Sequence, residues 1–407
     1  MAIRISTQMM YDRNVSQLSN LHGNMLRTQM QLSTDRRVLT PADDPVSSAR
    51  ALEVTQSYEL NEQYVLNRQS ASASLVQVDS TLETVNDILD NALVEVVRAG
   101  NPGQSQSDRD AIAVALEGHL ADLLSQANTA DGSGGYLFSG YKTNTQPFAL
   151  TADGADYYGD QGRRELQVGS GRQMAISATG SEIFLENPTG NRTFQTGADP
   201  ANTGTGVISP GTIVGTTQPI NYEINFTKDA TTGAVEFSVT NTDDGSQVMP
   251  PTAFKSGEPI VFGGMSFDIT GAPANGDKFT IEPSRNQSVF TTIRDVVKAL
   301  RNPGSGPTAG AELTNALNRA NQNLQNARDN VLSVRASVGA RENELETLDS
   351  SASALRIQYS DQITNLIGLT TEGQIEAVSR FQQQTTSLTA AQQTFRSATQ
   401  LSLFNYI

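Results

Sequence analysis

The chain contains no cysteine and no tryptophan, and its only histidines are His22 and His119. Without cysteine it can form no disulfide and no thiolate metal site, and it offers no thiol nucleophile. The two histidines lie far apart in the sequence, each in a helical segment with no second imidazole nearby, so we expect no metal ligation from them. These absences remove several classes of redox, metal and catalytic chemistry.

Positive charge and long apolar runs are also in short supply. Lysine is scarce and the formal net charge is -15, which argues against a nucleic-acid or an anionic-membrane partner. No apolar run approaches the roughly 18 residues that a membrane span requires. The first residues lack the apolar segment and the cleavage site of a Sec-type signal peptide. We therefore expect a protein that stays in the cytoplasm or leaves the cell by a route that needs no cleavable signal.

Apolar residues repeat in steps of three and four between Leu313 and Tyr359, a pattern that we call the heptad stripe. Arg341 is its only charged member. Such a stripe predicts a long helix that packs against other helices as in a coiled coil, and at 1.5 Å per residue it would span roughly 70 Å. That length suits a rod or an assembly subunit. The positions are Leu313, Leu317, Ala320, Leu324, Ala327, Val331, Val334, Val338, Arg341, Leu345, Leu348, Ala352, Leu355 and Tyr359.

Helical patterns also fill the first 130 residues or so. Ser6 is a candidate cap for a first helix, which two prolines end near residues 41–45. A second long helix is expected at about 46–99, and Ser107-Asp108 is expected to cap a third. Helix is expected to resume at Asn286 before the heptad stripe, and a last helix to follow Gly373. The rod core is predicted to comprise Leu82, Val85, Leu89, Leu324, Val331, Val334, Val338, Leu345, Leu348 and Leu355.

Alternating apolar residues mark a different region from about Asp131 onward. Short runs such as Tyr222/Ile224/Phe226 have the period of two that strands show, and turn sequences such as Asp243-Asp244-Gly245 separate them. A stretch rich in glycine and threonine, about 187–218, is predicted to be a long loop or a mobile edge. The fold class is thus mainly α, a long coiled-coil-like helical bundle formed by the N- and C-terminal regions, with an antiparallel β domain inserted in the middle.

The two ends of the chain share an unusual lack of charge. Between Asn14 and Thr34 the only formal charge is Arg27, and residues 374–407 carry only three charges. A solvated helix usually carries more, whereas uncharged polar groups can enter an interface without the large cost of burying a charge. Two interpretations remain open: helices that order against each other or against neighbouring subunits, and a pair of helices that completes an ordinary bundle.

No motif gives catalysis a firm basis. Gly135–Thr143 imitates a phosphate-binding loop, but Tyr141 separates Gly140 from Lys142 and the pattern requires them to be adjacent. Asp43-Asp44 could form an acid/base or metal pair, although capping of the next helix is the preferred interpretation. Asp243-Asp244-Gly245 lacks the spacing of a calcium loop. We predict no enzyme, no cofactor and no metal.

Several segments resemble the flagellin superfamily, and within it the flagellar hook-associated protein 3 family. They are Met1-Ala-Ile-Arg-Ile-Ser-Thr-Gln-Met-Met-Tyr, the stretch from Gln31 to Val46 with its Pro-Ala-Asp-Asp-Pro, the glycine-aromatic turn Gly135–Phe148, and the end Leu401-Ser-Leu-Phe-Asn-Tyr-Ile. The resemblance covers about 1–147 and 284–407. Asp35 stands where that pattern leads us to expect a glycine, which would alter the bend there.

The resemblance implies a subunit built in three layers. Residues 1–44 and 369–407 would form an inner tube, 45–147 and 284–368 a helical rod, and 148–283 an outward-facing β domain. The inner-tube residues expected to contact neighbours are Ile3, Ile5, Met9, Leu18, Leu21, Met25, Leu32, Val378, Phe381, Leu388, Phe395, Leu401, Leu403, Phe404 and Tyr406.

The resemblance also implies a function and a set of partners. The chain would be a structural adaptor at the hook–filament junction of the bacterial flagellum, outside the cell, exported unfolded through the flagellar type III channel and folding on assembly. Its partners would be further copies in a ring, a hook-associated protein on the hook side, and flagellin or the other junction protein on the filament side. An export chaperone would hold the C-terminal helix, about 370–407.

Two alternatives of other classes remain open. The chain could be a filament flagellin, although flagellin usually lacks the Pro-x-Asp-Asp-Pro pattern and ends differently. It could also be a hydrolase on a flagellin-like scaffold. That would require a convergent set of titratable residues within 150–283, and the sequence shows no candidate.

Overall fold

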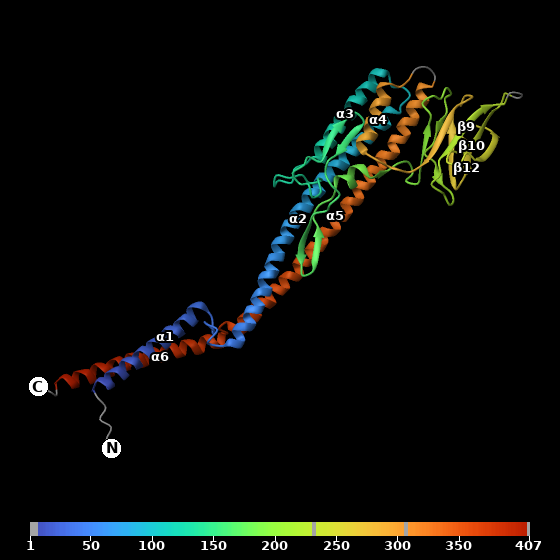
Figure 1. Cartoon of the computed structure of the whole chain (residues 1–407). Coiled ribbons are helices and arrows are strands. Elements are labelled where there is room, and N and C mark those ends of the chain that lie inside the picture. Colours follow the sequence, from blue (N-terminus) through green and yellow to red (C-terminus); the bar gives the residue numbers. More distant parts are fainter. Residues whose placement is uncertain (1–6, 230–232, 305–307, 405–407) are drawn as a thin grey trace. The chain divides into compact units, whose positions relative to one another are not determined.

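The computed structural model describes residues 7–229, 233–304 and 308–404, with residues 7, 8, 10 and 398–404 described by their backbone alone (Figure 1). It divides into two compact units, one made of residues 1–67 and 346–407 and the other of residues 68–345. The fold is mainly α with an antiparallel β domain inserted in the middle of the chain, which confirms the predicted fold class. Two long helices, α2 (Pro45–Ala99) and α5 (Ala309–Ile367), contribute to both units.

The first unit contains the terminal helices α1 (Thr7–Thr34) and α6 (Thr371–Phe404) together with one end of α2 and one end of α5. Pro45 is the first residue of α2, a position at which its missing N–H costs no helical hydrogen bond. The Asn61 side chain, buried between α2 and α5, donates from Nδ2 to the Ala352 carbonyl at 3.1 Å. This unit buries few apolar side chains: Val38, Ala51, Ala352, Leu369, Ala377 and Leu388.

The second unit has a dense helical core. Its helices are α2 from residue 68 onward, α3 (Gln106–Ala127), α4 (Val289–Arg301) and α5 up to residue 345. Asp79 pairs with Arg335 at 2.9 Å and Asp90 with Arg328 at 3.2 Å, so α2 and α5 run antiparallel. Apolar side chains from all four helices are buried between them, among them Leu75, Leu82, Leu89, Ile112, Leu116, Leu123, Ile293, Leu300, Leu324 and Val331.

Three predicted helix starts were wrong. The last helix, expected after Gly373, begins at Thr371. Ser105, not Ser107, is the N-cap of α3, and Asp108 closes a capping box with it by accepting from the Ser105 N–H at 3.0 Å. The helix expected from Asn286 begins at Val289, after Ser288. Asn286–Gln287 instead forms the short strand β15, which pairs with β5 (Asn187–Pro188).

Short β elements cover the helical core. They are the hairpins β1 (Phe148–Thr151) with β2 (Gly154–Tyr157) and β3 (Glu165–Gly169) with β4 (Arg172–Ala175), followed by a π-helical turn, η1 (Ser181–Leu185). Four aromatic rings join them to α4. Phe148 packs against Phe184, Phe290 and Tyr157 with ring centroids 5.0–5.3 Å apart.

The inserted domain is a sandwich of two antiparallel sheets (Figure 1). The buried faces meet in a core rich in aromatic and branched residues, including Ile224, Phe226, Val239, Ile269 and Phe279. One sheet has the order β11 (Gln247–Ala253), β10 (Val235–Asn241), β9 (Tyr222–Lys228), β14 (Lys278–Pro283), β6 (Phe194–Ala198). The other has β12 (Pro259–Phe262), β13 (Met265–Thr270), β7 (Val207–Ile208), with β8 (Thr212–Ile213) also on β13.

The prediction of one long loop at 187–218 was wrong in part. Strands β5 to β8 lie within it, because β13, β14 and β15 supply their hydrogen-bonding partners from later in the sequence. These partners are 50 to 100 residues away, so local composition could not indicate them.

Candidate assembly surfaces

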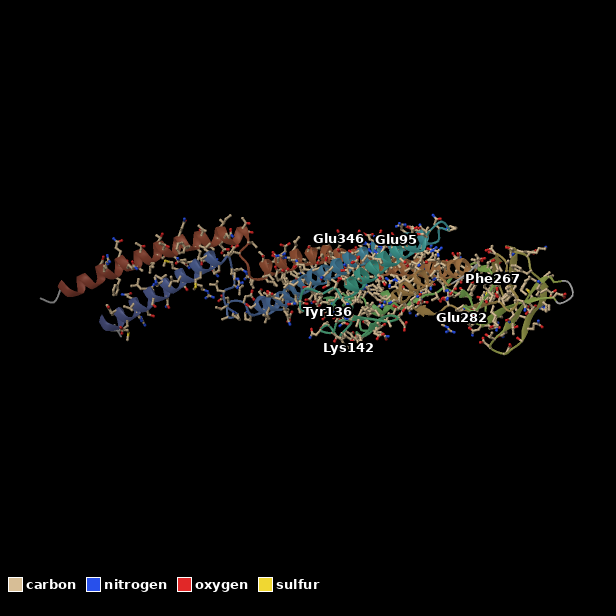
Figure 2. The ribbon with its side chains drawn as sticks, turned by 90° about the horizontal axis from the view of Figure 1, so that it is seen from above. Glu95, Tyr136, Lys142, Phe267, Glu282 and Glu346 are labelled. Atoms are coloured by element: carbon tan, nitrogen blue, oxygen red, sulfur yellow. The ribbon has the colours of Figure 1, made fainter. Side chains whose placement is uncertain are left out.

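The terminal helices α1 and α6 lie side by side (Figures 1 and 2). The Tyr11 and Phe395 rings approach to 5.3 Å between centroids. In the part of this pair whose side chains are described, the buried residues are Thr28, Ala377 and Leu388. Partly buried neighbours include Leu18, Leu21, Met25, Leu32 and Phe381. The contact is therefore narrow for two helices of 28 and 34 residues.

Much of the apolar surface of this pair is exposed. Met9 is 51% exposed and Val378 45% exposed, so neither packs into the α1–α6 contact. Ile3, Ile5 and Tyr406 lie outside the described residues. Leu401, Leu403 and Phe404 belong to α6, where only their backbone is described. Further apolar side chains in the open are Tyr11, Val15, Leu26, Met30 and Ile375.

Asp35 makes the bend that ends α1. Its φ is +55°, the left-handed region that glycine enters most easily, and the Arg36 N–H donates to the Gln31 carbonyl at 3.1 Å, the six-to-one bond of a Schellman end. The bend therefore forms although aspartate replaces the expected glycine. Aspartate adopts the left-handed conformation at a lower free-energy cost than most other residues. The Asp35 carboxylate also provides a hydrogen-bond acceptor that glycine lacks: Gln374 Nε2 donates to Asp35 Oδ1 at 2.7 Å.

Residues 35–38 and 366–369, which we call the clasp, join the two connections of the first unit. The N–H groups of Arg37 and Val38 donate to the Ile367 carbonyl at 2.8 and 3.2 Å, and the Leu369 N–H donates to the Asp35 carbonyl at 3.0 Å. Arg37 Nη2 donates to the Leu366 carbonyl at 2.9 Å. The connection from α1 to α2 and the connection from α5 to α6 are thereby held together.

Asp44 caps α2, whereas Asp43 holds the turn that precedes it. Asp44 Oδ1 accepts from the Ser47 N–H at 3.0 Å at the start of α2, and this hydrogen bond lowers the pKa of the Asp44 carboxyl. Asp43 Oδ2 accepts from the N–H groups of Leu39 and Thr40, each at 3.0 Å, and Oδ1 contacts the Arg27 guanidinium. The capping interpretation therefore fits Asp44 alone, and the Asp43 carboxylate stabilises the turn at residues 39–43 instead.

The predicted rod-core residues divide by position. Leu82, Val85, Leu89, Leu324, Val331, Val334, Val338 and Leu345 are buried, and Leu348 is partly buried. Leu355 is 40% exposed, so its assignment to the core was wrong. Leu355 lies in the first unit. The helices α3 and α4, which help to bury the apolar residues of α5 in the second unit, do not belong to it.

Arg341, the one charge of the heptad stripe, is partly buried. Its Nη1 donates to the Ala175 carbonyl at 3.3 Å and its Nη2 to Ser337 Oγ at 3.1 Å. Burial, with the nearby Arg163 guanidinium, lowers its pKa. Among the described residues it has no carboxylate in ion-pair contact, so the stripe accommodates it through neutral oxygens of β4 and of its own helix.

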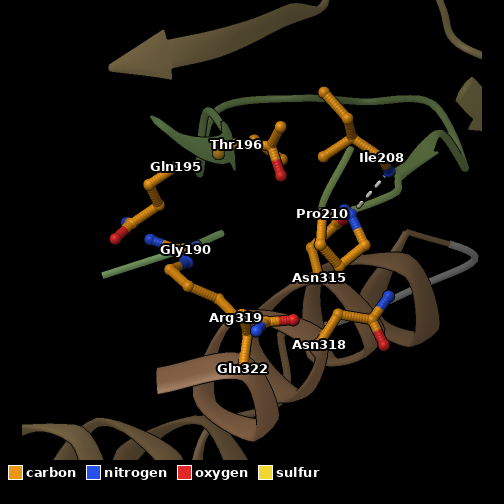
Figure 3. Close-up of a pocket in the computed structure, with 11 residues that line it drawn as sticks. Gly190, Gln195, Thr196, Ile208, Pro210, Asn315, Asn318, Arg319 and Gln322 are labelled. Atoms are coloured by element: carbon orange, nitrogen blue, oxygen red, sulfur yellow. Dashed lines mark hydrogen bonds between the residues drawn. The ribbon is translucent and has the colours of Figure 1, made fainter. Parts of the chain in front are cut away.

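A row of asparagines on α5 holds the inserted segments and was missed from the sequence. Asn315 accepts from the Ile208 N–H and donates to the Gly206 carbonyl, both at 3.0 Å (Figure 3). Asn323 accepts from the Gly190 N–H at 2.9 Å, and Asn326 donates to the carbonyls of Pro188 and Gly190 at 2.7 Å. Their spacing of eight and three places them on one helix face, a signal that was present beside the heptad stripe.

The glycine-rich turn at 135–143 binds a carboxylate of the chain itself. Asp160 Oδ1 accepts from the N–H groups of Tyr141 and Gly162, both at 2.8 Å. Gly140 has a φ of +74°, and a Cβ there would lie 2.1 Å from Asp160 Oδ1. Backbone N–H groups that could have faced a phosphate are thus occupied.

Asp131, just before this turn, is held in the same way. Burial acts to raise the pKa of its carboxyl, but hydrogen bonds from Ser133 and Gly135 and a 3.2 Å contact with Arg164 outweigh it, and the pKa falls to about 2. The described residues contain no cluster of three or more potential metal ligands, and no described helix is long and apolar enough to cross a membrane.

Long antiparallel helices, an inserted β sandwich and a charge-poor, narrowly packed pair of terminal helices define a structural subunit of an assembly. Residues 5–143 match the model of the bacterial flagellin N-terminal helical region. A solved flagellar hook associated protein-3 is 30% identical and is covered over 98% of its length, so the chain belongs to the flagellar hook-associated protein 3 family.

The similarity to known proteins extends over most of the chain. The chain is similar to flagellar hook-associated protein 3 of Salmonella typhimurium, 28% identical over 403 residues, with 99% of each chain covered. It is also similar to the crystal structure of flagellar hook associated protein-3 from Legionella pneumophila, with 30% identity, a TM-score of 0.74, and coverage of 77% of this chain and 98% of that one. The crystal structure of FlgL from Xanthomonas campestris is 27% identical with a TM-score of 0.70, and the match covers 76% of this chain and 99% of that one.

Proposed function

We propose that the chain is the structural adaptor at the hook–filament junction of the bacterial flagellum. Its family membership supports this, together with relatives named flagellar hook-associated protein 3 that match over 99% of their length. A solved relative with 30% identity is described as a flagellar junction protein. The proposal gives the chain a structural role and assigns it no reaction.

The proposed mechanism, folding coupled to assembly, is supported by the small contact between α1 and α6. Each buried apolar side chain contributes about 1.5–3 kcal/mol, whereas ordering a backbone costs about 1–2 kcal/mol per residue. In the part of the pair whose side chains are described, only two buried side chains are apolar, Ala377 and Leu388, too few to offset that cost for helices of 28 and 34 residues. The terminal helices would therefore order fully when neighbouring copies cover Tyr11, Val15, Leu26, Met30 and Val378.

The family resemblance supports a set of layers and partners, which we include in the proposal. Residues 1–44 and 369–407 of several copies would form the inner tube, residues 45–147 and 284–368 the helical layer, and residues 148–283 the outer surface. One end of the ring would contact a hook-associated protein and the other end flagellin or a second junction protein. Before export in unfolded form, an export chaperone would cover the C-terminal helix.

Amide hydrogen exchange on the purified monomer tests coupled folding. We expect weak protection in residues 7–34 and 375–404 and strong protection in the core of residues 68–345. Assembly should raise the protection of the terminal helices. Strong protection of both terminal helices in the monomer would contradict the proposal.

Immunogold labelling of flagella tests the location. Label in a band between hook and filament supports the adaptor, and label along the filament supports the flagellin alternative. Growth of purified protein into long filaments would likewise favour flagellin.

A further inference from the structure

We propose that the clasp sets the register of α1 against α6, with Asp35 and Gln374 as its positioning residues. The terminal helices would then order outward from the clasp when copies meet. This inference rests on the proposed folding on assembly, and it adds where that folding starts and what fixes its alignment.

Polar contacts at the base of the helix pair are the first support. Three backbone hydrogen bonds of 2.8–3.2 Å cross between residues 35–38 and 367–369, and Arg36 and Gly368 form an antiparallel bridge. Val38 and Leu369 are buried beside them, at 5% and 8% exposure. The clasp therefore combines backbone pairing with apolar burial, whereas the helices beyond it have little of either between them.

The apolar contact between α1 and α6 is too small to specify one alignment by itself. Sliding one helix by a turn, about 5.4 Å, would exchange one half-exposed apolar contact for another of similar size. In coiled coils a single polar contact fixes the register in this situation, because a shifted arrangement leaves it unpaired. The hydrogen bond between Gln374 and Asp35 is exposed, so it favours the aligned register through the bond itself and through its place beside the backbone pairing.

The position of this contact makes it decisive. Asp35 directly follows the last residue of α1, and Gln374 lies in the first turn of α6. Gln31 Nε2 reinforces the bend by donating to the Arg37 carbonyl at 2.7 Å. The C-terminal end of α1 and the N-terminal end of α6 are thus joined. The alignment set there determines which residues meet further along the pair, such as Tyr11 with Phe395.

Disulfide trapping measures the register directly, because the natural chain has no cysteine. The full chain with Tyr11→Cys and Phe395→Cys reports the aligned pair, and the chain with Tyr11→Cys and Ala391→Cys reports a shift of one turn. We expect the first pair to cross-link on assembly and the second to remain mostly reduced. Adding Gln374→Ala should raise the ratio of shifted to aligned product about tenfold, the value of a hydrogen bond to a charged group.

Matched variants separate the side chain from the backbone. Asp35→Asn keeps an acceptor and tolerates the left-handed conformation, so it should retain the register. Asp35→Gly keeps the bend but loses the acceptor and should behave like Gln374→Ala. Gln382→Ala, an exposed position on the same helix, is the control and should change nothing.

The outcomes distinguish this inference from the proposed function. An unchanged cross-linking ratio in Gln374→Ala and Asp35→Gly would overturn the positioning role. Strong protection of both terminal helices in the monomer would instead overturn coupled folding, and the cross-linking ratio would still decide the register.

Discussion

Asp131 shows how one carboxylate secures an irregular segment. Its hydrogen bonds from the Ser133 and Gly135 N–H groups close the turn at 131–135, and its pKa of about 2 lies below the ordinary 3.8. Such a group stabilises the fold above its unfolded-state pKa and loses that effect as the pH falls through its folded-state value.

We therefore predict that Asp131→Asn lowers the free energy of unfolding of the second unit by about 1–3 kcal/mol at pH 7. The difference from the natural chain should shrink below pH 4 and vanish near pH 2. Urea unfolding followed by circular dichroism at several pH values measures this, with Asp122→Asn on the exposed side of α3 as the control. A loss that does not depend on pH would show that the charge of Asp131 is not involved.

Asn326 supports the inserted segment through two backbone carbonyls. Asn326→Ala leaves the Pro188 and Gly190 carbonyls without this donor, so we expect a loss of roughly 2–4 kcal/mol in stability. Proteolysis within residues 187–210 should become faster. Asn318→Ala, partly exposed on the same helix, should have little effect. Equal protease resistance in both variants would contradict a supporting role for the asparagine row.

At the scale of elements, the faces of α6 differ in their contacts. Phe395 packs on Tyr11, so Phe395→Asp places a charge in that contact. We predict that Phe395→Asp, like Phe381→Asp, abolishes assembly and motility while residues 68–345 stay folded. Gln393→Asp, which adds the same charge on an exposed position, should assemble. Motile cells carrying Phe395→Asp would exclude a role for this ring in assembly.

Periodic elements were predictable and irregular connections were not. The heptad stripe and the alternating strands depend on residues close in sequence, so their patterns predicted α5 and strands such as β9. Leu355 follows the same period but is exposed. Its exposure was not predictable, because periodicity does not show how many helices surround a position. The asparagine contacts and strands β5 to β8 depend on partners far along the chain, and single-residue chemistry does not reveal such pairings.

At the scale of the whole molecule, stability should reside in the second unit. We predict that a chain limited to residues 36–369 keeps the thermal midpoint and the far-ultraviolet signal per residue of that unit, while it loses the ability to assemble. Calorimetry and circular dichroism on both chains measure this. A large drop in the midpoint on removal of the terminal helices would show that they stabilise the monomer.

The asparagine row contacts main-chain atoms of the inserted segment almost exclusively. Amide side chains of α5 bind the N–H groups of Gly190 and Ile208 and the carbonyls of Pro188, Gly190 and Gly206. Main-chain atoms are common to every residue, so these hydrogen bonds set few requirements on side chains, although a Cβ at Gly190 would lie 2.2 Å from the Phe194 carbonyl oxygen and Arg192 adds an ion pair with Asp329. The exposed surface of the β domain is therefore free to diverge in sequence while these hydrogen bonds to α5 stay the same.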